Sequence, residues 1–77
     1  MYDTVNMKGS EFVRLIKKIG DERGVSVRFV THQGKGSHGR IYYGSNFATV
    51  KDRKKEIGPG LLRAMLRQLG LKQEDIL

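Results

Sequence analysis

The sequence predicts a small α+β domain in which two helices flank a three-stranded antiparallel sheet. Apolar residues recur at helical spacing near both ends of the chain, at 10–20 and 59–70, and β-favouring segments lie between them. Its 77 residues fit a single domain, 1–77. A chain this short buries only about 60% of the surface that its unfolded state exposes. We therefore expect one small core and a ligand site on the surface.

The first predicted helix begins at Ser10 and ends at Gly20. Serine is a favourable N-cap and glycine a favourable C-terminal stop. Four apolar residues recur at i, i+3, i+4 and i+7 and so share one face: Phe12, Leu15, Ile16 and Ile19. Residues 1–8 show no period and are predicted to be a loose lead-in.

Three strands are predicted after a polar connection at 21–24. Apolar and other residues alternate over 25–30, the period of a half-buried strand. The second strand covers 40–43 and the third 47–51, with a turn at 44–46 between them. Because these connections are short, the strands should pair as an antiparallel meander.

The second predicted helix begins at Pro59, after a basic loop at 52–58. Proline suits the first helical turn because its missing N–H is not needed there. Four apolar residues again share one face, Leu62, Met65, Leu66 and Leu69, and Gly70 follows as the stop. Residues 72–77 are predicted to add a short C-terminal turn. The resulting α-β-β-β-α order places both helices on one sheet face, an order shared with double-stranded-RNA-binding domains.

The charge balance favours an anionic partner. Lys and Arg number 15 and Asp and Glu 8, which gives a net charge of +7. No acidic residue occurs between Arg23 and Lys51. Such a surface attracts polyanions, so nucleic acid is the favoured partner, although a solvated basic face is the simpler alternative.

Several classes of protein are excluded or disfavoured by the composition. The chain has no cysteine, which excludes disulfides and thiolate metal sites. No apolar run approaches the roughly 20 residues that span a bilayer, and the first residues lack the pattern of a signal peptide. We expect a cytoplasmic protein without a membrane partner.

A glycine-rich run, Gly34-Lys-Gly-Ser-His-Gly39, joins the first two predicted strands and is interpreted as a hairpin tip. It matches G-x-G-x-x-G, but a strand follows it where a dinucleotide site requires a helix, and no acidic residue lies about 20 positions on. We therefore expect no nucleotide cofactor. A flexible turn with incidental polar residues is the simpler interpretation of the run.

His38 is the predicted catalytic residue, because histidine can exchange a proton near neutral pH. Beside a ribose 2′-OH and its phosphate, His38 could begin metal-free cleavage of RNA, although lone surface histidines are usually inert. If the hairpin is symmetric about Lys35, His32 faces His38; a second proton-exchange role and a solvated residue both stay open. Two histidines without suitably spaced acids predict no metal site.

The predicted RNA contacts surround His38 and precede the second helix. Lys35 and Arg40 would hold a phosphate together with the backbone of Gly36 and the hydroxyl of Ser37. Lys54 and Lys55 lie near a helix N-terminus that can also receive a phosphate. Tyr42 and Tyr43 must point to opposite sheet faces, so one ring can be exposed and stack on a base or simply pack.

Four segments resemble the HicA (YcfA-like) toxins of bacterial toxin–antitoxin pairs: 8–12 (KGSEF), 34–39 (GKGSHG), 41–44 (IYYG) and 54–71 (KKEIGPGLLRAMLRQLGL). The resemblance implies an mRNA interferase with a double-stranded-RNA-binding-like fold and a HicB-like antitoxin that covers the active site. It also implies that His38 is catalytic, and it gives His32 no role. A longer lead-in, 24–34, departs from the family pattern.

The sequence thus suggests a metal-independent endoribonuclease toxin that cleaves single-stranded mRNA. Two alternatives stay open. The chain could be a non-catalytic RNA-binding module, or a protein-interaction module whose basic surface docks an acidic partner. Strand scission in the presence of EDTA distinguishes the first hypothesis from both.

Overall fold

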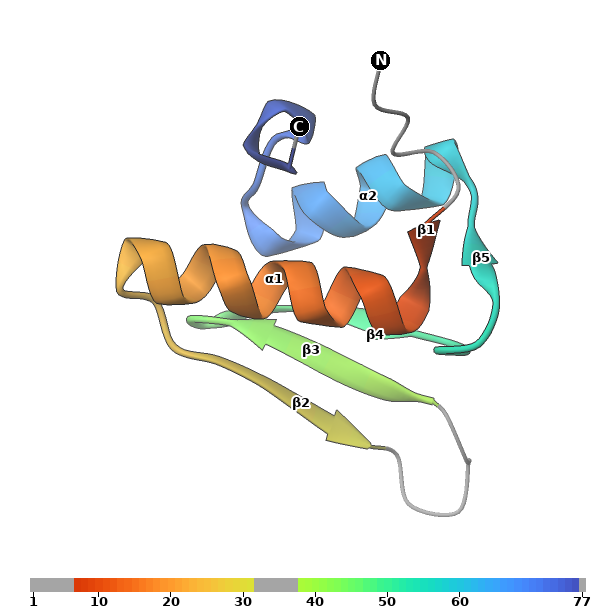
Figure 1. Ribbon diagram of the computed structural model, residues 1–77, viewed down its shortest axis with the longest axis horizontal. Coiled ribbons are helices and arrows are strands. Elements are labelled where there is room, and N and C mark those ends of the chain that lie inside the picture. The colour runs from red at the N-terminus through yellow and green to blue at the C-terminus, as the bar shows by residue number, and fades with distance from the viewer. Residues whose placement is uncertain (1–6, 32–37, 77) are drawn as a thin grey trace.

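The computed structural model describes residues 7–31 and 38–76 as a two-layer α+β arrangement (Figure 1). The elements in chain order are β1 (Met7–Lys8), α1 (Gly9–Arg23), β2 (Val27–Thr31), β3 (Gly39–Tyr43), β4 (Asn46–Val50), β5 (Glu56–Ile57), α2 (Pro59–Leu69) and the 3-10 helix η1 (Gln73–Ile76). Strands β2, β3 and β4 form an antiparallel sheet in that order, and both helices lie on one of its faces. The predicted fold class and strand meander are confirmed.

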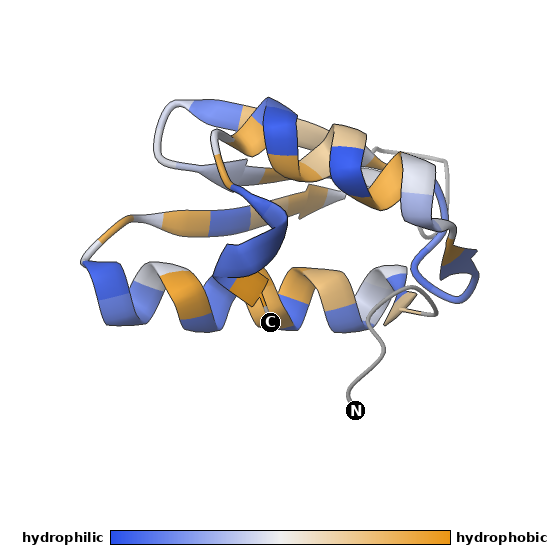
Figure 2. Ribbon diagram, turned by 90° about the horizontal axis from the view of Figure 1, so that it is seen from above, coloured by the Kyte–Doolittle hydropathy of each residue, from blue (hydrophilic) through white to orange (hydrophobic). Residues whose placement is uncertain are grey.

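The core lies between the helices and one face of this sheet. Ile41 in β3 is fully buried at the centre of this core. Hydrophobic and hydrophilic residues alternate along both helices, as expected for helices with one buried side (Figure 2). Phe29 and Tyr43 pack against the core from the same sheet face. Its fully buried members are Phe12, Ile16, Ile41, Leu62, Leu66, Leu69 and Val50. The apolar stripes predicted for the two helices therefore share one core, in which α1 packs on β2 and β3 and α2 packs on β4.

A second, two-stranded sheet was not predicted. Met7 pairs with Ile57 and Lys8 with Glu56, so β1 and β5 join the start of the chain to the segment before α2. Met7 and Ile57 are buried. The predicted lead-in therefore does not reach residue 8, and the predicted loop at 52–58 contains a strand. Two-residue strands are too short to show a period in the sequence.

The boundaries of α1 differ from the prediction at both ends. Lys8 is the N-cap in place of Ser10, and its backbone N–H donates to Glu11 Oε1 at 2.8 Å. The helix continues through Gly20 and ends at Arg23, with Gly24 as its C-cap at a φ of 70°. Its last turn thus includes residues that the sequence assigned to a polar connection.

Gly20 lies inside α1 because the helix passes very close to the chain entering β2. A Cβ on Gly20 would lie 2.3 Å from Val27 Cγ2 and 2.7 Å from the carbonyl oxygen of Val25. Close packing, and not helix termination, requires glycine here. Both ends of α2 follow the prediction. Pro59 is its first residue, and Gly70 is its C-cap with a φ of 79°.

A C-terminal ion pair fastens η1 to the end of α1. Arg23 Nη2 lies 2.8 Å from Asp75 Oδ1, and the backbone N–H of Lys72 donates to Asp75 Oδ2 at 2.7 Å. The Arg23 guanidinium and then the Lys72 N–H hold the pKa of the Asp75 carboxyl below its usual value. Ile76 is buried beside this pair, so the last described residues close the open end of the core.

Substitution Gly20→Ala should lower the free energy of unfolding by about 1–2 kcal/mol, because the added methyl group overpacks the contact with β2 by more than alanine's helix propensity restores. Chemical denaturation followed by circular dichroism measures the change. Gly60→Ala in α2 is the matched control, since its Cβ would meet nothing within 4 Å. Equal stability of the two variants would contradict this account of Gly20.

The Asp75–Arg23 pair should add an acid-sensitive component to stability. A carboxyl whose folded pKa lies below its unfolded value stabilises the fold above the unfolded pKa, and that stabilisation is lost as pH falls through the folded pKa. Asp75→Asn should therefore lower the melting temperature at neutral pH and reduce its decline below about pH 4. Thermal melts at several pH values test this, with Glu74→Gln as the control. Parallel pH profiles for wild type and Asp75→Asn would refute it.

Candidate functional site

Alternation along β3 separates the core side chains from those of the open sheet face. Gly39 and Ile41 are buried toward the helices, whereas Arg40 is exposed on the opposite face. Tyr43 packs against the core, and Tyr42 lies on the open face, as the sequence predicted for this pair. The open face is therefore the surface on which β3 presents its polar and charged side chains.

His38 lies directly before β3, is exposed, and shares a surface hollow with Arg40. The hollow has a volume of 410 Å³ and is lined by Val30, Thr31, His38, Gly39, Arg40, Tyr42 and Thr49. The structure therefore brings together two of the predicted site residues, the imidazole and one cation. An imidazole beside a guanidinium can exchange a proton next to a bound phosphate.

The position of His38 is fixed by its neighbour Gly39, which is the buried first residue of β3. A Cβ on Gly39 would lie 2.5 Å from Phe29 Cζ and 2.6 Å from the carbonyl oxygen of Val30. Gly39 pairs with Thr31 and Val50 in the sheet. The last glycine of the predicted hairpin tip is thus a strand residue, and it is required by a close approach of the Phe29 ring.

The other predicted residues do not all join this hollow. Lys35, Gly36 and Ser37, together with His32, lie outside the described residues. Lys54 and Lys55 are exposed in the segment before β5. Lys55 lines a second hollow of 170 Å³, which shares Thr49 with the first and also includes Leu61 and Met65 of α2.

Arg53 is a cation whose position the sequence did not indicate. Its guanidinium carbon lies 5.0 Å from the centroid of the Phe29 ring, on the core side of the sheet. Its Nε is buried and has no hydrogen-bond partner among the described residues. The Phe29 ring also lies close to Gly39, the residue after His38. The Arg53 charge and Gly39 are therefore both neighbours of the same ring. In the sequence Arg53 was only one member of a basic run.

Four side chains form a continuous row across the open sheet face, and we call this row the arginine–aromatic ladder. Arg28 lies over the Tyr42 ring at 4.9 Å, Tyr42 contacts the Phe47 ring at 5.6 Å, and Arg40 lies over Phe47 at 4.8 Å. The pairing of Arg28 with Tyr42 and of Tyr42 with Phe47 aligns three of them across β2, β3 and β4. The sequence predicted that one tyrosine ring lies on the outer sheet face. The sheet register adds Arg28 and Phe47 beside it, and Arg40 completes the row.

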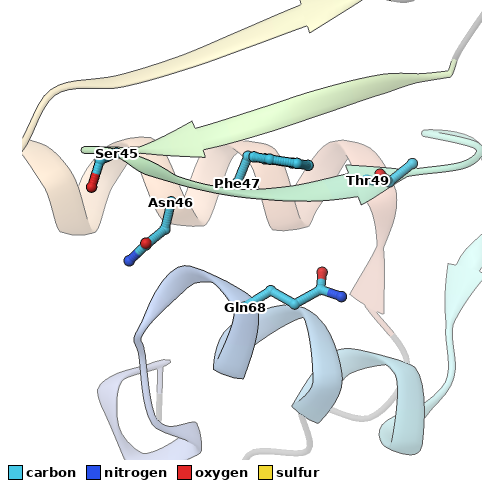
Figure 3. Close-up of a pocket in the computed structure, with 5 residues that line it drawn as sticks. All are labelled: Ser45, Asn46, Phe47, Thr49 and Gln68. Atoms are coloured by element: carbon cyan, nitrogen blue, oxygen red, sulfur yellow. The ribbon is translucent and has the colours of Figure 1, made fainter.

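The free edge of β4 borders a further hollow, of 370 Å³. Figure 3 shows Asn46 pointing from β4 toward α2 and Gln68 extending from α2 toward the same strand. The Asn46 amide donates to the carbonyl oxygen of Leu69 at 3.1 Å and ties the helix to the strand. This contact holds β4, and with it Phe47, in position on the sheet.

The electrostatics of the open face are uniformly positive or neutral. Strands β2, β3 and β4 contain no acidic residue. Over the described ranges 7–31 and 38–76, no three His, Asp or Glu side chains come together as a possible metal site. Within the same ranges, no helix is both long and apolar enough to cross a membrane.

Comparison with known proteins identifies the relatives of the chain. Residues 9–71 match the family described as the HicA toxin of bacterial toxin–antitoxin systems. A curated relative from Pseudomonas fluorescens (strain Pf0-1), named probable mRNA interferase HicA, is 40% identical over 67 residues, which cover 86% of this chain and 98% of the relative. No solved structure matches the chain significantly. The chain belongs to the HicA toxin family.

Proposed function

We propose that this HicA-family protein is an endoribonuclease that cleaves single-stranded mRNA without a metal ion, with His38 as its acid–base catalyst. The observation that carries the proposal is the exposed His38 beside Arg40, in a hollow on a sheet face without acidic residues. Family membership supports it, and so does the relative named a probable mRNA interferase.

In the proposed reaction the ribose 2′ oxygen forms a bond to the adjacent phosphorus, and the bond from phosphorus to the 5′ oxygen of the next nucleotide breaks. His38 accepts the proton of the 2′-OH or donates one to the departing 5′ oxygen, and water completes the exchange. The Arg40 guanidinium balances the negative charge that builds on the phosphate oxygens. The products are a 2′,3′-cyclic phosphate and a 5′-hydroxyl.

The remaining predicted residues complete the proposed RNA contacts. Lys35, the Gly36 backbone and Ser37 would surround the same phosphate, in a segment outside the described residues. Lys54 and Lys55 would bind phosphates of the strand farther from the scissile bond. Such contacts position the RNA and carry no sequence information.

A HicB-like antitoxin is the proposed protein partner, since the family is the toxin half of a pair. To block the reaction, this partner must cover the hollow that contains His38. Carboxylates on its surface would complement the basic open face. The same protein would then act as a ribonuclease when free and as a silent binding partner when covered.

Replacing His38 by Ala or Gln should reduce RNA cleavage by about 10²–10⁴-fold, because the proton exchange at the 2′ or 5′ oxygen loses its catalyst. Denaturing gels with a labelled single-stranded RNA, run in EDTA, measure the rate. A strand with 2′-deoxyribose throughout should stay intact. Lys17→Gln on α1 is the control and should cleave like wild type.

Three outcomes would overturn parts of this proposal. Wild-type rates in a folded His38→Ala protein would remove His38 from the chemistry. Loss of cleavage in EDTA would remove the metal-free mechanism. Tight RNA binding without any scission would leave a non-catalytic RNA-binding module.

Arg40→Gln should weaken binding of single-stranded RNA and reduce its salt dependence, because one phosphate contact is lost. The slope of log K against log salt concentration should become shallower by about 0.7. Fluorescence anisotropy with 2′-O-methyl RNA, which lacks the attacking hydroxyl, measures binding without cleavage. Lys17→Gln makes the same change in net charge on α1, and an equal slope in both variants would contradict a phosphate contact at Arg40.

A further inference from the structure

We propose that the arginine–aromatic ladder is a stacking platform on which unpaired bases of single-stranded RNA bind, with Phe47 and Tyr42 as the stacking rings. This inference rests on the proposed function and specifies how the substrate lies on the protein. It places the RNA across the open face of β2, β3 and β4.

The exposure of these rings is the first argument. Phe47 is 44% exposed although it lies in the sheet, and Tyr42 is half-buried beside it. Within the described part of the chain, both helices pack on the other face, so the rings contribute little to the core. A flat apolar surface on an open sheet is suited to a planar apolar ligand, and every nucleobase has such a face.

The charges around the rings are the second argument. Arg28 and Arg40 flank the two rings, and the guanidinium carbon of each lies over one of them, 4.9 and 4.8 Å from the ring centroid. A guanidinium held in this way keeps its N–H groups available at the rim, where they can donate to phosphate oxygens. Rings for the bases and cations for the backbone are the two parts of a single-strand site.

The location of the ladder is the third argument. Arg40 belongs both to the ladder and to the hollow that contains His38, and Tyr42 also lines that hollow. A strand whose bases stack on Phe47 and Tyr42 can therefore continue toward the imidazole. The ladder would hold nucleotides next to the bond that is cut.

This arrangement selects single strands over duplexes. Bases inside a duplex are already stacked on one another and cannot present a face to Phe47. Double-stranded-RNA-binding domains recognise mainly the shape and phosphates of the duplex, whereas sheet platforms with exposed aromatic residues bind splayed bases. The fold order is that of the first class, but the open face of this sheet has the chemistry of the second.

The test measures binding separately from cleavage, on the His38→Ala background, by anisotropy of a labelled single-stranded RNA and of the matching duplex. Phe47→Ala and Phe47→Leu should each weaken single-strand binding about fivefold or more, whereas Phe47→Trp should bind as tightly as Phe47 or more tightly. The salt slope should not change, because Phe47 carries no charge. Leu15→Ala is the control, since Leu15 is a partly buried apolar side chain of α1, in the helix layer that packs on the other face of the sheet.

Two results would overturn the platform. Wild-type affinity in Phe47→Leu would mean that apolar area alone matters, and an equal loss for single strand and duplex would mean that stacking on unpaired bases is not involved. Circular dichroism and melting temperatures verify that each variant is folded.

Failure of the platform leaves cleavage by wild-type protein intact. Failure of the nuclease proposal leaves ring-dependent binding intact, so the two are distinguished.

Discussion

The site depends on the alternation of β3, whose buried residues fix which of its side chains lie on the open sheet face. Ile41 is fully buried under the helices, and the Phe29 ring leaves no room for a Cβ at Gly39. A shift of one residue would exchange the two faces completely. His38 and Arg40 therefore lie on the open face because the residues between and after them are held in the core.

Glycine has two different uses in this chain. Gly24 and Gly70 end the helices with positive φ, which other residues adopt only with strain. Gly20 and Gly39 instead allow two elements to approach closely, the first at the contact of α1 with β2 and the second at the start of β3. The second use is the one that matters for the site, because it brings the Phe29 ring, over which Arg53 lies, next to Gly39, the residue that follows His38.

The open face combines features that are separate in the sequence. Arg28, Tyr42 and Phe47 come from three strands and meet because the register aligns them, and Arg40 contacts Phe47 from the next pair on the same face. Phe47 and Tyr42 stay outside the core although the protein is small. Two buried stripes on the helices already fill the core, so the second face of the sheet is available for a partner.

By itself, the sequence predicted the order of the two main helices and the three strands between them, the apolar faces of both helices and the placement of Tyr42 and Tyr43 on opposite sheet faces. It also nominated His38 and Arg40 as site residues. These predictions follow from local periods and side-chain chemistry. The sequence misplaced the end of α1 at Gly20 and missed β1 and β5, whose pairing joins segments about 50 residues apart. The tertiary structure alone decided that Lys55 lines a different hollow from His38, that Arg53 lies over the Phe29 ring and that Phe47 completes the arginine–aromatic ladder. Such contacts depend on which strands are neighbours and on how closely they pack, and no local pattern records either.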